Sequence, residues 1–249
     1  MDKRKYLIEY LLSESNSRTK IPQDEDGQKR LLRALFNVRP PMPVSEEFLK
    51  IQDEYLTERK NERGVTDAKN LIYTRGVALF KGDITTLAAD AIVNAANSAM
   101  LGCFHPNHGC IDNAIHTFAG VQMRLDCNAI MQGREAENGE VVVTKAYNLP
   151  SRFVFHTVGP IVCGRVTKEN ESDLKKCYLN CLEKAEEMKL NSIAFCCIST
   201  GVFGYPKDEA AILAVKTVRE RLDKTKSDPK VVFNVFTEED YDIYRRILG

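Results

Sequence analysis

The sequence has no excess of either charge. Lysine and arginine together number 35, and aspartate and glutamate also number 35, so the formal net charge is zero. A neutral chain has no overall field with which to attract nucleic acid or an anionic membrane, and we expect neither as a partner. Any ligand must therefore be recognised by a local group of residues.

Long apolar runs are also absent. No run approaches the roughly 18 residues that a membrane-spanning helix needs. The first ten residues, MDKRKYLIEY, include neither a sustained apolar stretch nor a small-residue cleavage site of the kind that ends a secretory signal. We therefore expect a cytoplasmic protein with no membrane association.

The eight cysteines do not follow the pattern of a disulfide-bonded secreted protein. Cys196 and Cys197 adjoin within an apolar run, while Cys177 and Cys181 have helical spacing beside other apolar residues. These four positions indicate reduced thiols in a hydrophobic core.

Composition allows one large domain with an extension, because 249 residues that are 43% hydrophobic can bury a sizeable core. Apolar residues recur at helical spacing in residues 31–36 and 48–55, and the prolines of residues 40–43 separate the two stretches. Ser45, followed by two glutamates, is typical of a helix start. We expect a helical extension over residues 1–70 and a single domain over residues 71–249.

From residue 77 onward, short apolar runs alternate with helical segments. Most of these runs are continuously apolar, which is typical of strands buried on both faces. The runs are Val77–Phe80, Ala91–Val93, Val141–Val143, Phe153–Phe155, Ile193–Cys197 and Val231–Phe236. Helices are expected over residues 174–188 and 206–222. The alternation predicts an α/β domain with three layers, α/β/α, and a mixed central sheet.

Ligands of such sheets bind beyond the carboxyl ends of the strands, so the residues that follow each run are informative. Asp83 can accept a hydrogen bond from an exocyclic amine, and the amides of Asn94 and Asn97 suit sugar hydroxyls because they both donate and accept. Residues 198–206 contain two glycines and run from a strand into a helix start, where backbone N–H groups can bind phosphate. Plain turns and loop capping are the alternatives at all of these positions.

Soft-metal ligands crowd the segment that follows Asn97. Cys103, His105, His108 and Cys110 lie within eight residues, and thiolate with imidazole favours an ion of the zinc class. If all four bound one ion, the site would be closed and structural, although Phe104 and a proline beside His105 give poor convergence on one ion. A metal-free loop with ordinary thiols is the third interpretation.

Five segments of the chain resemble the motifs of the macrodomain family and occur in the same order. The segments are GDIT at residues 82–85, NAAN at 94–97, DNAIH at 112–116, HTVGP at 156–160 and STGVFGYP at 199–206. The resemblance covers residues 77 to about 240. The helical extension resembles that of a microbial subgroup, the zinc-dependent macrodomains found beside lipoate-related sirtuins.

The resemblance implies a cleft for ADP-ribose. Asp83 would bind the adenine amino group with the backbone of Ile84 beside it, and Asn94 and Asn97 would line the distal ribose. The diphosphate would be enclosed by five consecutive residues, of which the last also meets the distal ribose: Ser199, Thr200, Gly201, Val202 and Phe203.

One departure from the family pattern concerns the metal. Metal-free hydrolytic macrodomains have a run of glycines where this chain has Cys103, His108 and Cys110, and Asn113 replaces a further glycine. In the zinc-dependent subgroup these three residues are the ligands, which implies one Zn²⁺ per chain with a fourth tetrahedral position open. An ion there would polarise a ribose hydroxyl or the scissile oxygen, or lower the pKa of a water toward about 7.

Asp112 and Asn97 are the catalytic residues that this resemblance implies, with Asp112 orienting or deprotonating the attacking water. The plainer interpretation of Asp112 is an N-cap of the helix that starts there, and the two roles are compatible. His116 lies one helical turn further on, where we expect a packing role.

The leading hypothesis is a hydrolase that removes mono-ADP-ribose from modified proteins by cleaving the bond between the distal ribose and an acidic or hydroxyl side chain. A reader that binds ADP-ribose without chemistry is one alternative, and a deacetylase of O-acetyl-ADP-ribose is another. The family context favours a lipoyl-carrier protein as the modified target. The helical extension would either brace the domain or grip that target.

Overall fold

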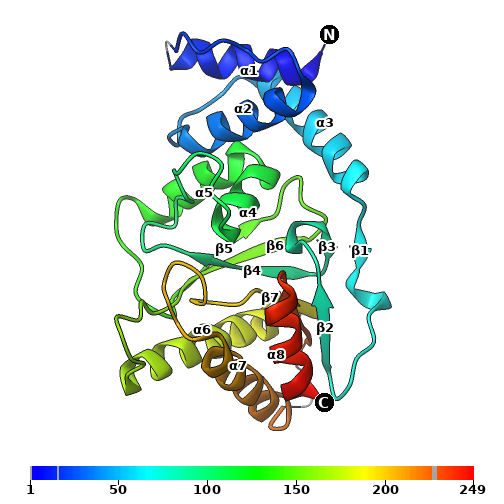
Figure 1. Ribbon diagram of the computed structural model, residues 1–249, viewed down its shortest axis with the longest axis vertical. Helices are drawn as coiled ribbons and strands as arrows, with labels where there is room; N and C mark the ends of the chain where they lie inside the picture. The colour runs from blue at the N-terminus through cyan, green and yellow to red at the C-terminus, as the bar shows by residue number, and fades with distance from the viewer. Residues whose placement is uncertain (1, 16, 226–228) are drawn as a thin grey trace.

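A six-stranded mixed sheet forms the centre of the molecule (Figure 1). The computed structural model describes residues 2–15, 17–225 and 229–249. From one edge to the other, the strands are β2 (Val77–Lys81), β8 (Lys230–Val235), β7 (Ser192–Phe195), β4 (Ala91–Ala96), β6 (Phe153–Val158) and β5 (Val141–Lys145). All neighbours pair in parallel except β5, which runs antiparallel to β6.

Helices cover both faces of this sheet. Figure 1 shows α4 (Ile111–Ala119) and α5 (Val121–Met131) on one side of it, and three helices on the other side: α6 (Lys168–Glu187), α7 (Lys207–Leu222) and α8 (Glu238–Leu248). The four inner strands are largely buried on both faces, the edge strands β2 and β5 are only partly buried, and most of the buried apolar residues belong to one large core. The three-layer α/β/α fold with a mixed sheet is therefore confirmed.

Several boundaries differ from those expected. The strand expected over residues 193–197 ends at Phe195, and β4 continues to Ala96, so Asn94 lies in the strand and not in the loop after it. Helix α6 begins at Lys168, six residues before the expected start, because Thr167 and Asn170 form a capping box there.

The N-terminal extension consists of three helices, α1 (Lys3–Glu14), α2 (Glu25–Val38) and α3 (Glu46–Arg63). They share an apolar core of their own, which one residue of α5, Val121, joins. Ser45 caps α3, as the sequence predicts. Figure 1 shows the extension stacked on the side of the domain that carries α4 and α5.

Two short elements connect the extension to the sheet region. Strand β1 (Thr66–Asp67) pairs in parallel with β3 (Leu87–Ala88), and two 3-10 turns, η1 (Ala68–Asn70) and η2 (Ile84–Thr86), lie beside them in sequence. None of the helices in the described part of the chain combines the length and the apolar character that a membrane span requires.

Candidate active site

Cys103, His108 and Cys110 come together in the loop between β4 and α4. Their ligand atoms all lie within 4.8 Å of one another, and Cys103 Sγ is 3.5 Å from His108 Nδ1. A thiolate and an imidazole bound to one tetrahedral Zn²⁺ would be about 3.6 Å apart, given the usual bond lengths. All three side chains are partly exposed, and His105 is not a member of this group in the described residues. The donor set therefore fits an open zinc site.

Cys110 also starts the helix that follows. It is the N-cap of α4, and its Sγ accepts a hydrogen bond from the N–H of Asn113 at 3.4 Å. Asp112 lies inside the helix instead, so the N-cap interpretation of Asp112 was wrong. Sulfur is a weak acceptor, which is why the sequence favoured the carboxylate for this position.

Asp112 is buried beside the candidate ligands. Only 4% of the residue is exposed, and Oδ1 accepts a hydrogen bond from Asn94 Nδ2 at 2.8 Å. Burial raises the pKa of this carboxyl to about 6, although the hydrogen bond from Asn94 and the charge of Arg124 act in the opposite direction. His116 Nε2 lies 3.6 Å from the same oxygen.

His156 fixes the orientation of Asn94 from the neighbouring strand. The two residues are register partners on β6 and β4, and Asn94 Nδ2 lies 3.0 Å from His156 Nδ1. Because the amide nitrogen can only donate, Nδ1 must accept, and the ring proton sits on Nε2, which is 2.9 Å from Thr144 Oγ1. Burial lowers the pKa of His156 to about 3, so the ring is neutral. A line of hydrogen bonds thus runs from Thr144 to Asp112.

Asn97 closes the start of the candidate metal-binding loop, residues 102–110, hereafter the metal-binding loop. Its Nδ2 donates to the carbonyl of Gly102 at 3.2 Å. A side chain on Gly102 would meet the ring of His116 at 2.8 Å, and φ there is +82°, so only glycine suits this position. In the described part of the chain, the buried Oδ1 atoms of Asn94 and Asn97 have no hydrogen-bond partner. Two acceptors are thus left for hydroxyl donors.

The glycine-containing loop between β7 and α7 is held by its own backbone. Gly204 N–H donates to the Gly201 carbonyl and Tyr205 N–H donates to the Ser199 carbonyl, both at 3.0 Å, and the Phe203 carbonyl accepts from Val162 N–H at 2.8 Å. Ser199 adopts φ +65°, and its buried Oγ has no partner among the described residues.

Three consecutive N–H groups of this loop have no protein acceptor in the described part of the chain. Within the described residues, the N–H groups of Gly201, Val202 and Phe203 donate to no protein acceptor. Thr200 is turned inward, since its Oγ1 donates to the Cys197 carbonyl at 3.0 Å. Helix α7 begins at Lys207, directly after the loop, and the positive end of a helix dipole favours phosphate.

Asp83, which is expected to bind adenine, serves in the structure as a turn residue. Its Oδ1 accepts from the N–H and the Oγ1 of Thr85, at 2.9 and 2.6 Å, and it caps η2, which contains Ile84. Arg63 at the end of α3 donates to the other oxygen, Oδ2, at 3.1 Å and stacks on Phe118 of α4, 3.6 Å from the ring centroid. Sequence analysis missed Arg63 because nothing in its local pattern sets it apart.

A second group of potential ligands lies beneath this site. His116, Cys127 and His156 are all buried, with their ligand atoms within 4.8 Å of one another. Both ring nitrogens of His156 already have partners in Asn94 and Thr144, and burial raises the pKa of the Cys127 thiol to about 12. We therefore assign these three residues to packing and to the support of Asn94.

Known proteins resemble this chain along its whole length. The Macro domain family model matches residues 93–214. The chain is 50% identical to a protein-ADP-ribose hydrolase of Treponema medium, over 100% of this chain and 98% of that protein. It is 51% identical to a protein-ADP-ribose hydrolase of Staphylococcus aureus (strain MRSA252), over 96% of this chain and 92% of that protein.

Solved structures agree with these relatives. The Oceanobacillus iheyensis macrodomain with ADP has a TM-score of 0.63 and 41% identity, covering 69% of this chain and 89% of its own. The Trypanosoma brucei macrodomain in complex with ADP-ribose has a TM-score of 0.68 and 31% identity, covering 87% and 95%. Identity near one half over the full chain is more than a shared fold requires, and this chain belongs to the macrodomain family.

Proposed function

We propose that this protein is a zinc-dependent hydrolase that removes mono-ADP-ribose from modified proteins, cleaving the bond between the distal ribose and an acidic or hydroxyl side chain. The observation that carries the proposal is the group formed by Cys103, His108 and Cys110, with a buried carboxylate two residues beyond it. The curated relatives, named protein-ADP-ribose hydrolases, support the same reaction class.

The ligand would lie along the edge of the sheet. Its diphosphate would accept hydrogen bonds from the three available N–H groups of residues 201–203, next to the start of α7. The adenine would lie at Asp83 and Ile84, and the distal ribose at Asn94, Asn97 and Phe203. This orientation directs the anomeric carbon toward the metal-binding loop, since Asn97 is bonded to Gly102 at the start of that loop.

Cys103, His108 and Cys110 would hold Zn²⁺, leaving one coordination position for water or substrate. The bound ion would supply Lewis-acid polarisation of a ribose hydroxyl or of the scissile oxygen. Asp112 would accept a proton from the attacking water, and Asn94 keeps its carboxylate in place by occupying Oδ1. The other oxygen of Asp112, Oδ2, has no hydrogen-bond partner among the described residues, so it is the atom that would receive the proton.

The test measures zinc content together with release of ADP-ribose from a mono-ADP-ribosylated protein, with and without a chelator. A modified lipoyl-carrier protein is the first target to try. We expect one zinc per chain and release that stops when zinc is removed and returns when it is restored. Release at an undiminished rate from zinc-free protein would contradict the zinc dependence.

Two variants separate the hydrolase from a reader. Asp112→Asn is nearly isosteric and should lower the release rate by a factor of about 100 or more while leaving affinity for free ADP-ribose within a few fold. Cys110→Ser should lose zinc, whereas Cys163→Ser, at an exposed cysteine outside the group, should not. A wild type that binds ADP-ribose but releases none would favour the reader. Preferential hydrolysis of O-acetyl-ADP-ribose over modified protein would favour the deacetylase.

A further inference from the structure

Helix α2 of the extension contacts the metal-binding loop through Arg33. Its Nε and Nη2 donate to the side-chain oxygen of Asn113 at 3.1 and 2.8 Å, and Nη2 also donates to the backbone carbonyl of His108 at 3.0 Å. A planar guanidinium can satisfy two acceptors at once in a fixed geometry. Arg33 therefore joins the first turn of α4 to the backbone of a candidate metal ligand.

Asn113 passes this contact on to the rest of the loop. It is fully buried, and its Nδ2 donates to the carbonyl of His105 at 3.0 Å and lies 3.5 Å from that of Cys103. Its own N–H donates to Cys110 Sγ. Together, the Arg33–Asn113 pair reaches the backbone at Cys103 and His108 and the sulfur of Cys110. Each of the three candidate ligands thus has a hydrogen bond to this one pair.

A second residue of α2 holds the tip of the loop. The buried Asn37 accepts from the N–H of Asn107 at 2.9 Å, where the chain adopts φ +54°, a conformation uncommon in residues other than glycine. Asn37 Nδ2 donates to Thr117 Oγ1, which in turn donates to the carbonyl of Asn113 at 2.7 Å. The tip and the helix start are therefore tied to the same two side chains of α2.

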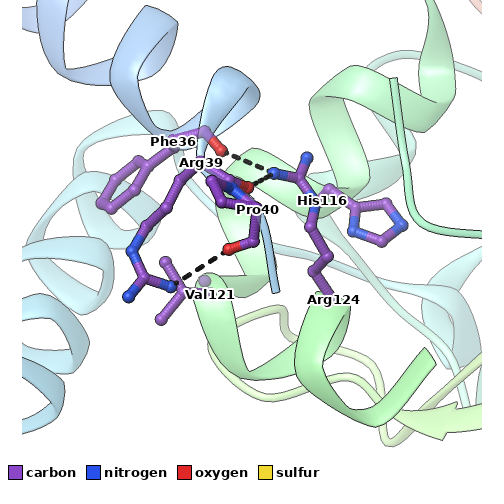
Figure 2. Close-up of a pocket in the computed structure, with 7 residues that line it drawn as sticks. Phe36, Arg39, Pro40, His116, Val121 and Arg124 are labelled. Atoms are coloured by element: carbon purple, nitrogen blue, oxygen red, sulfur yellow. Dashed lines mark hydrogen bonds between the residues drawn. The ribbon is translucent and has the colours of Figure 1, made fainter. Parts of the chain in front are cut away.

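Arg124 of α5 fastens the beginning of the loop and ties it to the end of α2. It donates to the carbonyl of Leu101 at 2.7 Å, to that of Phe36 at 3.1 Å and to that of Arg39. Figure 2 shows Arg124 reaching the carbonyls of Phe36 and Arg39 beside His116. Arg124 thus connects the extension to the domain beside the loop.

We propose that Arg33 is a positioning residue for the metal centre, which acts through Asn113 to hold the three ligands in a binding arrangement before the ion enters. This inference rests on the proposed zinc dependence. The three ligands come from one segment of eight residues between Gly102 and Ile111, so without external bonds the segment would lose much conformational freedom on binding the ion. Removing a hydrogen-bond partner that orients a metal ligand typically lowers metal affinity by about 10- to 100-fold.

The test is zinc affinity, measured by competition with a chromophoric chelator on the full chain. Arg33→Met should weaken zinc binding by about 10- to 100-fold. Arg33→Lys, which keeps the charge but not the fork, should lie between Arg33→Met and the wild type. Arg4→Met is the matched control, because the hydrogen bonds of Arg4 among the described residues go to Glu25 and Gln28 within the extension. This variant should bind zinc like the wild type.

Cobalt substitution gives an absorption spectrum that a loss of folding stability alone would not change. The thiolate-to-cobalt and d–d absorption bands report how the ligands surround the ion, and they should change in Arg33→Met at saturating cobalt but not in Arg4→Met. Asn113→Ala should also weaken zinc binding, and the double variant should lose less affinity than the two single losses combined, because either change alone removes the Arg33–Asn113 bonds. If Arg33→Met does not fold, Arg33→Lys and Asn113→Ala carry the comparison.

The outcomes are distinct. Zinc binding by Arg33→Met within twofold of the wild type, with unchanged cobalt bands, would overturn this inference and leave the proposed function standing. Absence of zinc binding by the wild type would overturn both.

Discussion

The neutral state of His156 gives the strongest prediction about pH. The ring accepts from Asn94 through Nδ1 and donates to Thr144 through Nε2, so a proton on Nδ1 would place two donors face to face. Burial lowers the pKa in the folded chain to about 3, whereas an unfolded histidine has a pKa of about 6.5. As pH falls below about 6.5, the unfolded chain takes up a proton that the folded chain refuses, so the folded state loses stability.

The magnitude follows from these two pKa values. Between about pH 7.5 and pH 5, the free energy of unfolding should fall by about 2 kcal/mol because of His156 alone. Below about pH 3 the loss reaches its limit, about 5 kcal/mol, since the pKa shift of about 3.5 is worth about 1.4 kcal/mol per unit. The contribution is fully present above the unfolded pKa and is lost as pH falls toward the folded one.

Urea unfolding of the wild type and of His156→Gln, both with a chelator present, measures this contribution. At about pH 7.5 the variant should be the less stable protein, because it loses part of a buried hydrogen-bond line, at a cost of about 1–3 kcal/mol. The difference should shrink by about 2 kcal/mol at pH 5. The carboxyl of Asp112, whose pKa is raised to about 6, has the opposite sign but is common to both proteins. A difference that stays constant between these pH values would refute the assigned neutral ring.

Two further substitutions test the proposed adenine and diphosphate parts of the cleft. Asp83→Asn keeps the acceptor for Thr85 but puts an amide donor in place of Oδ2, where Arg63 donates and where the adenine amino group would bind. It should therefore weaken ADP binding by about tenfold and remove the preference for ADP over inosine diphosphate in calorimetric titrations; an unchanged preference would place adenine elsewhere. Gly159→Ala would put a methyl group 2.1 Å from Ser199 Oγ. It should therefore lower the free energy of unfolding by about 1–3 kcal/mol and weaken the binding of ADP-ribose. Gly201→Ala meets nothing within 4 Å and should melt like the wild type; equal melting temperatures for both glycine variants would contradict the crowding at Gly159.

The strands could be predicted from the sequence because short, continuously apolar runs are typical of buried strands. Continuous apolar runs found all six strands of the main sheet to within a few residues, with errors at the ends. Asn94 shows why: it is polar, so it was expected in a loop, but its side chain satisfies His156 and Asp112 inside the core and therefore remains within β4. Helix α1 also has a pattern typical of a helix, since Leu7, Ile8, Leu11 and Leu12 recur at helical spacing and are buried.

The supports of the candidate site could not have been found in this way. Arg33 and Asn113 are 80 residues apart, and Arg63 and Asp83 belong to different elements. An arginine on an amphipathic helix usually faces solvent, and no local pattern distinguishes the one that does not. Potential metal ligands at short spacing can be recognised in a sequence because few residue types bind zinc. The residues that orient those ligands are instead defined by the packing of the extension on α4.

The parts of the cleft are stabilised by different means, and binding and chemistry should therefore respond separately to mutation. The glycine-containing loop between β7 and α7, where we propose that the diphosphate binds, is held by backbone bonds from within the domain, at Ser199, Gly201 and Phe203. The metal-binding loop depends on side chains of α2. A change at Arg33 should thus lower the release rate through the metal while affinity for free ADP-ribose persists, because most of that ligand's contacts would lie on the self-supported loop and around Asp83. In that arrangement α2 contributes to turnover more than to recognition, whereas α3 meets the proposed adenine end through Arg63.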